Sequence, residues 1–297
     1  MPEIFQAKSI VTMNLGQPRA THVMVSQGHI MSVGNADDVA QWQAKWPDAR
    51  VNTQFAEKAI LPGFVEGHSH MMEGLFWNFA YVGYYDREGP DGTIWPGLKS
   101  IDEVGARLNE LHAARADKTA PLIAWGFDPI FFEGRRMNLA DLDAVSTHCP
   151  IIVLHASLHI LNTNSFVVEK AGVSPGDNND AIRRDDAGQP TGEFLGQLGM
   201  YMAMRVTGLN LLAAAGEPQT LYNFAHVARQ VGVTTATDLA NPLPDNAVDT
   251  LAEVTSKDDY PCRLVVALQG GGPEAADGIR RLGELAARAS DKLRFSL

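Results

Sequence analysis

The sequence has no hydrophobic run long enough to cross a bilayer, and its first residues lack the basic start and apolar core of a signal peptide. Positive charge is also scarce, because 24 lysine and arginine residues face 35 aspartate and glutamate residues, for a net charge of −11. This balance argues against a nucleic-acid partner or an anionic membrane surface. We therefore expect a soluble protein with a cytoplasmic location.

Cysteine is nearly absent, with Cys149 and Cys262 as the only two. Cys149 precedes the apolar residues 151–154, so we interpret it as a small buried hydrophobe and not as half of a disulfide. Two catalytic signatures are missing as well. No Gly-x-Ser-x-Gly elbow is present, which argues against a serine hydrolase. The glycine-rich residues 269–273 lack the Lys-Ser/Thr of a phosphate loop and are predicted to be a βα loop.

The most informative stretch that is present is the pair His68 and His70 at the end of an apolar segment, residues 59–66. Side chains alternate along a strand, so residues two apart point the same way. Two imidazoles side by side at a strand end form half of a metal site. The sequence therefore predicts that both rings can share one divalent ion.

The chain changes character near residue 58. Residues 1–58 are predicted to form short strands with turns, followed by a short helix. Residues 59–297 alternate strand and helix patterns, which favours a parallel sheet with crossover helices. The predicted strands are 59–66, 121–127, 151–156, 233–239, 263–268 and 293–297, and the predicted helices are 101–116, 221–231, 245–255 and 274–287.

Several of these segments resemble the metal-dependent amidohydrolase superfamily. The run Leu-Pro-Gly-Phe-Val-Glu-Gly-His-Ser-His at residues 61–70 is similar to its first-strand motif. Later segments resemble amidohydrolase family 3, whose members include N-substituted formamide deformylases. Their order along the chain makes the resemblance specific, and they are residues 125–128, 142–153, 159–173, 186–192 and 232–238.

The resemblance implies an α/β fold: a small β-sandwich-like domain, residues 1–58, before a (β/α)8 TIM-like barrel, residues 59–297. The barrel would be incomplete, because six predicted strands follow residue 58 and eight are needed. It also implies that segments beyond residue 297 supply further metal ligands. We therefore expect a C-terminally truncated chain, with a naturally short protein as the alternative.

The resemblance further implies a metal-dependent hydrolase of amide-like, non-peptide C–N bonds in a small molecule, with zinc as the expected metal. His68 and His70 would be metal ligands. His159, Asp128 and Asp238 follow predicted strands and are the candidate catalytic residues, with His155 as an alternative to His159. The family's glutamate four residues after the glycine of its Pro-Thr-Gly motif is Gly196 here, and the nearest carboxylate is Glu193.

Three alternatives remain open. The chain could be a catalytically inactive protein of the same fold that regulates or binds small molecules. If it is instead a truncated enzyme, we expect little hydrolase activity from the chain alone. It could form a homo-oligomer. The aromatic-rich residues 74–97 could be a lid over the site or a surface loop that packs on itself.

Overall fold

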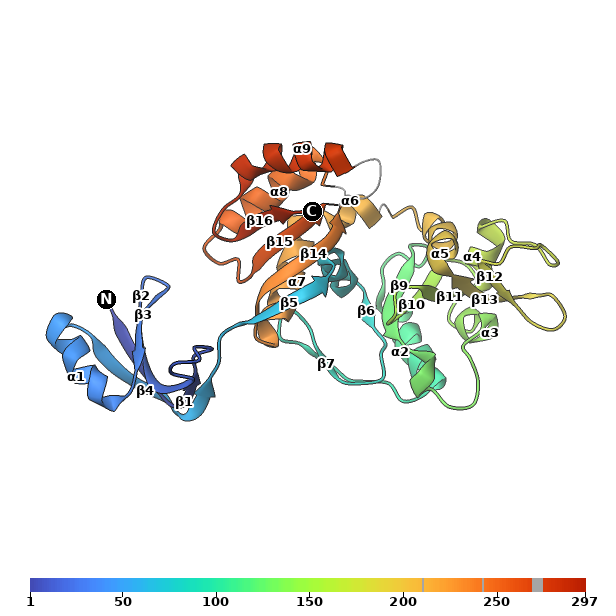
Figure 1. Cartoon of the computed structure of the whole chain (residues 1–297). Coiled ribbons are helices and arrows are strands. Elements are labelled where there is room, and N and C mark those ends of the chain that lie inside the picture. The colour runs from blue at the N-terminus through green and yellow to red at the C-terminus, as the bar shows by residue number, and fades with distance from the viewer. Residues whose placement is uncertain (210, 242, 269–274) are drawn as a thin grey trace. The chain divides into compact units, whose positions relative to one another are not determined.

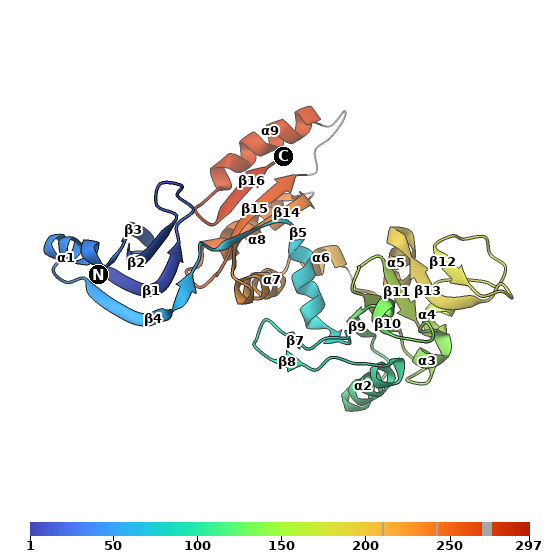
Figure 2. The ribbon, with the colours of Figure 1, turned by 60° about the horizontal axis from the view of Figure 1, so that its bottom comes forward.

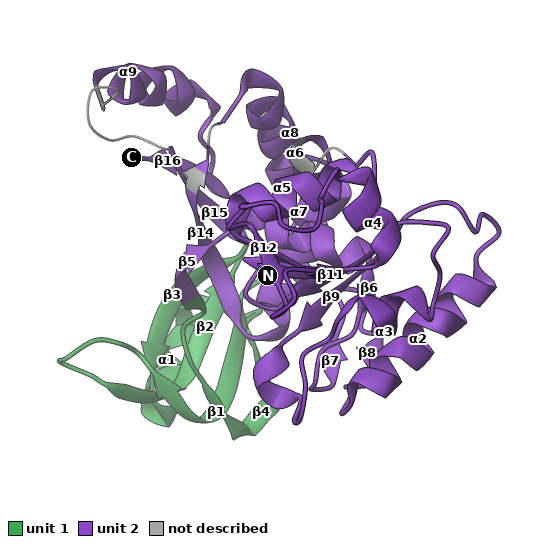
Figure 3. Ribbon diagram, turned by 90° about the vertical axis from the view of Figure 1, so that its right-hand side faces the viewer, with its two compact units in different colours: residues 1–64 green, residues 65–297 purple. Residues whose placement is uncertain are grey.

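The computed structural model describes residues 1–209, 211–241, 243–268 and 275–297, so the glycine-rich residues 269–273 lie outside the described part. The chain divides into two compact units, residues 1–64 and 65–297 (Figure 3). The boundary therefore falls slightly later than the sequence boundary after residue 58. Among the described helices, none combines the length and the apolar character needed to cross a bilayer.

The first unit is one four-stranded sheet with the order β3-β2-β1-β4 and a single helix. Its central strand β1 pairs antiparallel with β2 and parallel with β4. One sheet replaces the sandwich of two sheets that the resemblance implied for this region. Its elements are β1 (Glu3–Val11), β2 (Arg19–Ser26), β3 (His29–Gly34), α1 (Ala36–Lys45) and β4 (Arg50–Ile60).

The apolar segment 59–66 is not one strand. Ala59 and Ile60 end β4, and Phe64 begins β5 (Phe64–Ser69) in the sheet of the second unit. Pro62 and Gly63 interrupt the two, because proline cannot donate a hydrogen bond to a sheet ladder. This break separates the two units and leaves His68 near the end of a short strand.

The second unit contains a parallel sheet with the order β16-β15-β14-β5. Helices alternate with its last three strands, as the sequence pattern predicted, and Figure 2 shows β5 beside β14. Buried Leu251, Leu264 and Val266 contribute to the core between sheet and helices. The elements are α7 (Pro218–Gln230), β14 (Val233–Asn241), α8 (Asp245–Ser256), β15 (Arg263–Leu268), α9 (Ala275–Leu285), η4 (Ala286–Arg288) and β16 (Leu293–Ser296).

A second sheet of this unit has the order β12-β13-β11-β10-β9-β6 (Figure 1). Strands β6, β9 and β10 are parallel, whereas β11, β13 and β12 continue the sheet antiparallel. Its elements and those that surround it are η1 (Met71–Asn78), β6 (Ala80–Tyr81), β7 (Arg87–Glu88), β8 (Ile94–Trp95), α2 (Ile101–Ala114), β9 (Leu122–Phe127), η2 (Pro129–Phe131), α3 (Leu139–Asp143), β10 (Ile151–His155), β11 (Ile160–Thr163), α4 (Ser165–Lys170), β12 (Ile182–Arg184), β13 (Pro190–Leu195), α5 (Gly196–Arg205) and α6 (Leu211–Ala215).

This arrangement corrects the expected single barrel sheet. The strands at residues 121–127 and 151–156 lie in the mixed sheet and not beside β5, and the described strands form no closed barrel. Strand β9 pairs in parallel with β10 and β6, and the tight turn after β10, where Leu158 has a φ of 56°, returns the chain antiparallel as β11. A parallel barrel strand instead needs a crossover connection of a dozen residues or more.

Candidate functional site

The two histidines lie side by side at the end of β5. His68 is on the strand, and His70 follows it as the residue before η1. Their ring centroids are 5.6 Å apart, with the ring planes at 86°. Ser69 between them is buried and donates its hydroxyl to the carbonyl of Thr237 at 2.9 Å. This alternation holds both imidazoles on the opposite side of the strand from Ser69.

Asp238 lies against the same segment from the neighbouring strand β14. Its side chain is buried, at 4% exposure, and Oδ1 accepts the backbone N–H of Met71 at 2.8 Å. Oδ2 accepts the side-chain amide of Asn241 at 2.6 Å. Burial raises the pKa of the Asp238 carboxyl, while these hydrogen bonds and the nearby His70 oppose that rise. Asp238 is therefore a desolvated carboxylate beside the histidine pair.

Two glutamates flank the motif. Glu66 accepts the backbone N–H of His68 through Oε1 at 2.9 Å, so the partner that the structure gives it is the main chain and not an imidazole. Burial raises the pKa of Glu73, and the charges of His70 and Arg87 partly offset the rise. Glu73 therefore joins the charged groups around His70, and its place directly behind the histidine motif was the signal in the sequence.

A cavity of about 390 Å³ opens beside this cluster. It lies within the second unit, between β5, η1, α7 and the ends of β9 and β10. The aromatic segment predicted as a lid contributes Gly74, Phe76, Trp77 and Arg87 to its wall, next to His68. The segment thus borders the predicted site, and its closure as a lid remains a prediction.

The other two candidate catalytic residues lie apart from the histidine pair. Asp128 follows β9 and its Oδ1 accepts the backbone N–H of Ile130 at 3.1 Å, which makes it the cap of η2. His159 is exposed in the turn between β10 and β11, and its backbone N–H donates to the Ser157 hydroxyl. Both follow strands of the mixed sheet, so the structure groups only Asp238 with His68 and His70.

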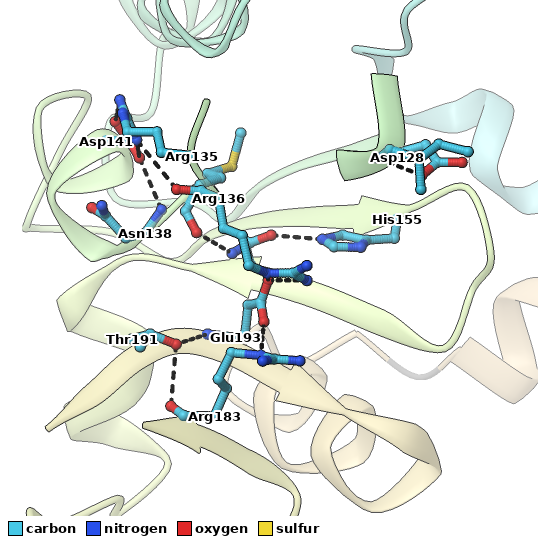
Figure 4. A network of polar contacts seen from close by, with 12 residues as sticks. Asp128, Arg135, Arg136, Asn138, Asp141, His155, Arg183, Thr191 and Glu193 are labelled. Carbon is cyan, nitrogen blue, oxygen red and sulfur yellow. Dashed lines mark hydrogen bonds and ion pairs between the residues drawn. The ribbon is translucent and has the colours of Figure 1, made fainter. Parts of the chain in front are cut away.

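His155 and Glu193 belong to a separate polar network (Figure 4). His155 is 2% exposed, and its Nε2 lies 2.6 Å from the side-chain oxygen of Asn162. Burial lowers the pKa of His155. The carboxylate of Glu193, at 1% exposure, is ion-paired with Arg136 at 2.5 Å and with Arg183 on its other oxygen. These ion pairs and hydrogen bonds link β10, β11, β12 and β13.

The donors near His68 and His70 match a divalent metal in type but not in number. Neighbouring imidazoles are ligands that zinc prefers, whereas a zinc site uses three or four protein ligands. Across the described ranges, no three His, Cys, Asp or Glu side chains are arranged to hold an ion together. Both Asp238 oxygens already accept hydrogen bonds. The residues thus fit half of a tetrahedral site.

Two curated proteins are similar in sequence. The exoenzymes regulatory protein AepA of Pectobacterium carotovorum subsp. carotovorum is 27% identical over 251 residues, which cover 80% of this chain and 49% of AepA. The Protein LONG AFTER FAR-RED 3 of Arabidopsis thaliana is 22% identical over 255 residues, which cover 85% of this chain and 40% of that protein. The chain therefore spans less than half the length of the curated relatives it matches.

Two crystal structures share the fold. They are uncharacterized metal-dependent hydrolases from Pyrococcus horikoshii OT3 and Pyrococcus furiosus, each with a TM-score of 0.59. The identities are 14% and 15%, and the alignments cover 99% of this chain and 53% and 55% of the two structures. The model of the amidohydrolase family matches residues 56–296, which contain the histidine pair, Asp238 and the cavity. That match covers most of the chain, which therefore belongs to the amidohydrolase family.

Proposed function

We propose that the protein is a metal-dependent hydrolase that cleaves an amide-like, non-peptide carbon–nitrogen bond in a small molecule. One arrangement carries the proposal. The rings of His68 and His70 lie side by side, and the buried Asp238 binds the main chain directly after them, beside a cavity of about 390 Å³. Cavities of this size hold small molecules. Family membership supports hydrolysis as the reaction class.

The proposed metal is zinc, because two imidazoles are the protein ligands available. When bound, such an ion lowers the pKa of its water to about 7 and polarises a carbonyl group. His68 and His70 would hold it, and the desolvated Asp238 would accept and return a proton, since burial already favours its protonated form. The exposed His159 and the half-buried Asp128 are proposed to contact the substrate at the cavity's rim, which Ala156 and Leu158 of the His159 turn help to form.

A second function has its own support. Within the described residues the ligand set is half complete, and one relative is named as a regulatory protein. The same cavity could bind a small molecule without turning it over. In that case the chain would regulate or sense its ligand, alone or as a homo-oligomer.

Metal analysis and an activity assay separate the two functions. The full chain is incubated with Zn²⁺ or Mn²⁺, freed of unbound metal and assayed with N-formyl and N-acyl amines, which the resemblance to formamide deformylases favours as first substrates. The proposal expects bound metal that His68→Ala and His70→Ala remove, and His148→Ala retains. His148 is the matched control, because it lies in an exposed loop before β10.

Turnover by this 297-residue chain is expected to be low, because two histidines hold a divalent ion weakly. Any measurable turnover should fall to background in both site variants. An unchanged metal content in these variants would refute the metal assignment. Tight ligand binding with neither metal nor turnover would favour the regulatory function.

A further inference from the structure

One wall of the cavity combines two indole rings with a cation. Trp77 and Trp125 meet edge to face, with ring centroids 5.0 Å apart. The guanidinium carbon of Arg87 lies 5.3 Å from the ring centroid of Trp125 and 5.6 Å from that of Trp77. These are cation–π distances, so the aromatic faces hold the guanidinium group in place beside the cavity.

This wall also has hydrogen-bond donors without acceptors. Trp125 is 7% exposed, and its indole Nε1 is buried with no hydrogen-bond partner among the residues that the structure describes. Arg87 contacts the hydroxyl of Tyr81 and forms no ion pair with any described carboxylate. A guanidinium group has five N–H donors, so most of them are open. The side chain of Arg87 is exposed, so its donors are accessible to a ligand in the cavity that it lines.

Another part of the lining is apolar. Helix α7 contributes Phe224, Val227 and Val231, and Leu158 adds to them from the turn after β10. The acidic groups of the lining belong to β5 and η1, where Glu66 is bonded to the main chain of His68 and Glu73 lies near His70. The lining therefore combines an imidazole and carboxylates with indoles and a guanidinium.

We propose that this cavity selects aromatic amides that carry a carboxylate, with Arg87 as the group that binds the anion. The aromatic part of the ligand packs between the indole wall and α7, and the guanidinium fork pairs with the two carboxylate oxygens. The amide part of this description rests on the proposed hydrolase function. The anion selectivity rests on the cavity wall alone.

The test measures binding to the full chain after treatment with EDTA, so that neither metal nor turnover is needed. The probes are 4-(formamidomethyl)benzoate and N-benzylformamide, which differ by one carboxylate. Isothermal titration should show that the benzoate binds about tenfold more tightly, as expected for a charge-assisted hydrogen bond in a partly enclosed site. Arg87→Met should abolish this difference, and Arg87→Lys should restore part of it.

Lys99→Met is the matched control, because Lys99 also lies over aromatic rings, those of Tyr84 and Tyr85, but outside this cavity. It should leave both affinities within twofold. Thermal unfolding of each variant verifies that it is folded.

Equal affinities for the two probes in the wild type would overturn the anion assignment, and so would equal losses in Arg87→Met and Lys99→Met. No binding of either probe would overturn the aromatic site itself. None of these outcomes tests the hydrolase proposal, which depends on His68 and His70. Conversely, carboxylate-selective binding with no metal uptake would support the cavity assignment and refute the hydrolase.

Discussion

We predict that adding one methyl group at Gly74 destabilises the site strongly. Gly74 is buried in η1, directly after the histidine pair. A Cβ atom there would lie 2.0 Å from the backbone oxygen of Thr220 and 2.8 Å from the backbone nitrogen of Phe224, both in α7. The carbonyl of Gly74 also accepts the side-chain amide of Asn223 at 3.1 Å. Gly74→Ala therefore forces η1 away from α7.

The magnitude follows from two terms. Overpacking a buried contact costs about 1–3 kcal/mol. Loss of the Asn223 hydrogen bond adds about 1 kcal/mol. The free energy of unfolding should thus fall by about 2–4 kcal/mol, which at roughly 2–4 °C per kcal/mol lowers the melting temperature by roughly 4–16 °C. Differential scanning calorimetry measures both quantities.

Gly105→Ala is the matched control for the same change. Gly105 lies inside α2, and a Cβ atom there would meet nothing within 4 Å. Alanine is favoured over glycine in a helix interior by roughly 0.5–1 kcal/mol, so this variant should be more stable than the wild type. If Gly74→Ala unfolds at the wild-type temperature, η1 does not pack against α7 as described, and the cavity between them loses its basis.

Three further predictions concern charged groups. Glu193→Gln should lower the free energy of unfolding by about 1–2 kcal/mol, because a buried carboxylate loses its ion pairs with two arginines. The control Glu253→Gln changes an exposed side chain and should alter that free energy by less than about 0.5 kcal/mol in chemical denaturation. The pKa of His155 is lower in the folded chain, so the unfolded chain binds the proton first as the pH falls. The free energy of unfolding should therefore decline below pH 6.5, and His155→Gln should flatten that part of the stability–pH curve. Equal curves for the wild type and the variant would refute this. Zn²⁺ should raise the melting temperature of the wild type but not of His68→Ala, and an equal rise in both would place the metal elsewhere.

Local elements were predictable because their patterns are local. The strand at residues 263–268 and the helix that begins at residue 101 form as the sequence indicated, since apolar alternation and the Ser100 cap are encoded within a few residues. Strand partners were not predictable in the same way. The direction of the chain after β10 depends on Leu158, whose φ of 56° is a conformation that leucine rarely adopts. Strands β9 and β10 therefore lie in the mixed sheet with β6 and β11, and not beside β5 as the sequence analysis expected.

The sequence predicted only part of the candidate site, because the site depends on which strands are neighbours. A residue that follows a parallel strand lies near the others only if the strands share one sheet. Asp238 follows that rule because β14 is the neighbour of β5, and its carboxylate therefore meets the main chain after His70. Asp128 and His159 also follow strands, but those strands belong to the other sheet. The sequence analysis singled out the segments of Arg87 and Trp125, but their contact had no sequence signal, since it joins a two-residue strand to β9.

Ion pairing separates the two polar clusters of the second unit by role. In the network of His155 and Glu193, buried charge is matched by arginine and buried imidazole by an amide, so its members stabilise the mixed sheet and have little capacity left for a ligand. Around the cavity the balance is opposite. Arg87 is exposed and forms no ion pair with a described carboxylate, and the imidazole of His68 is exposed. Open donors and an exposed ligand on one cavity are expected where the missing partner is a small molecule, because the bound ligand then supplies the bonds that the protein leaves unmade.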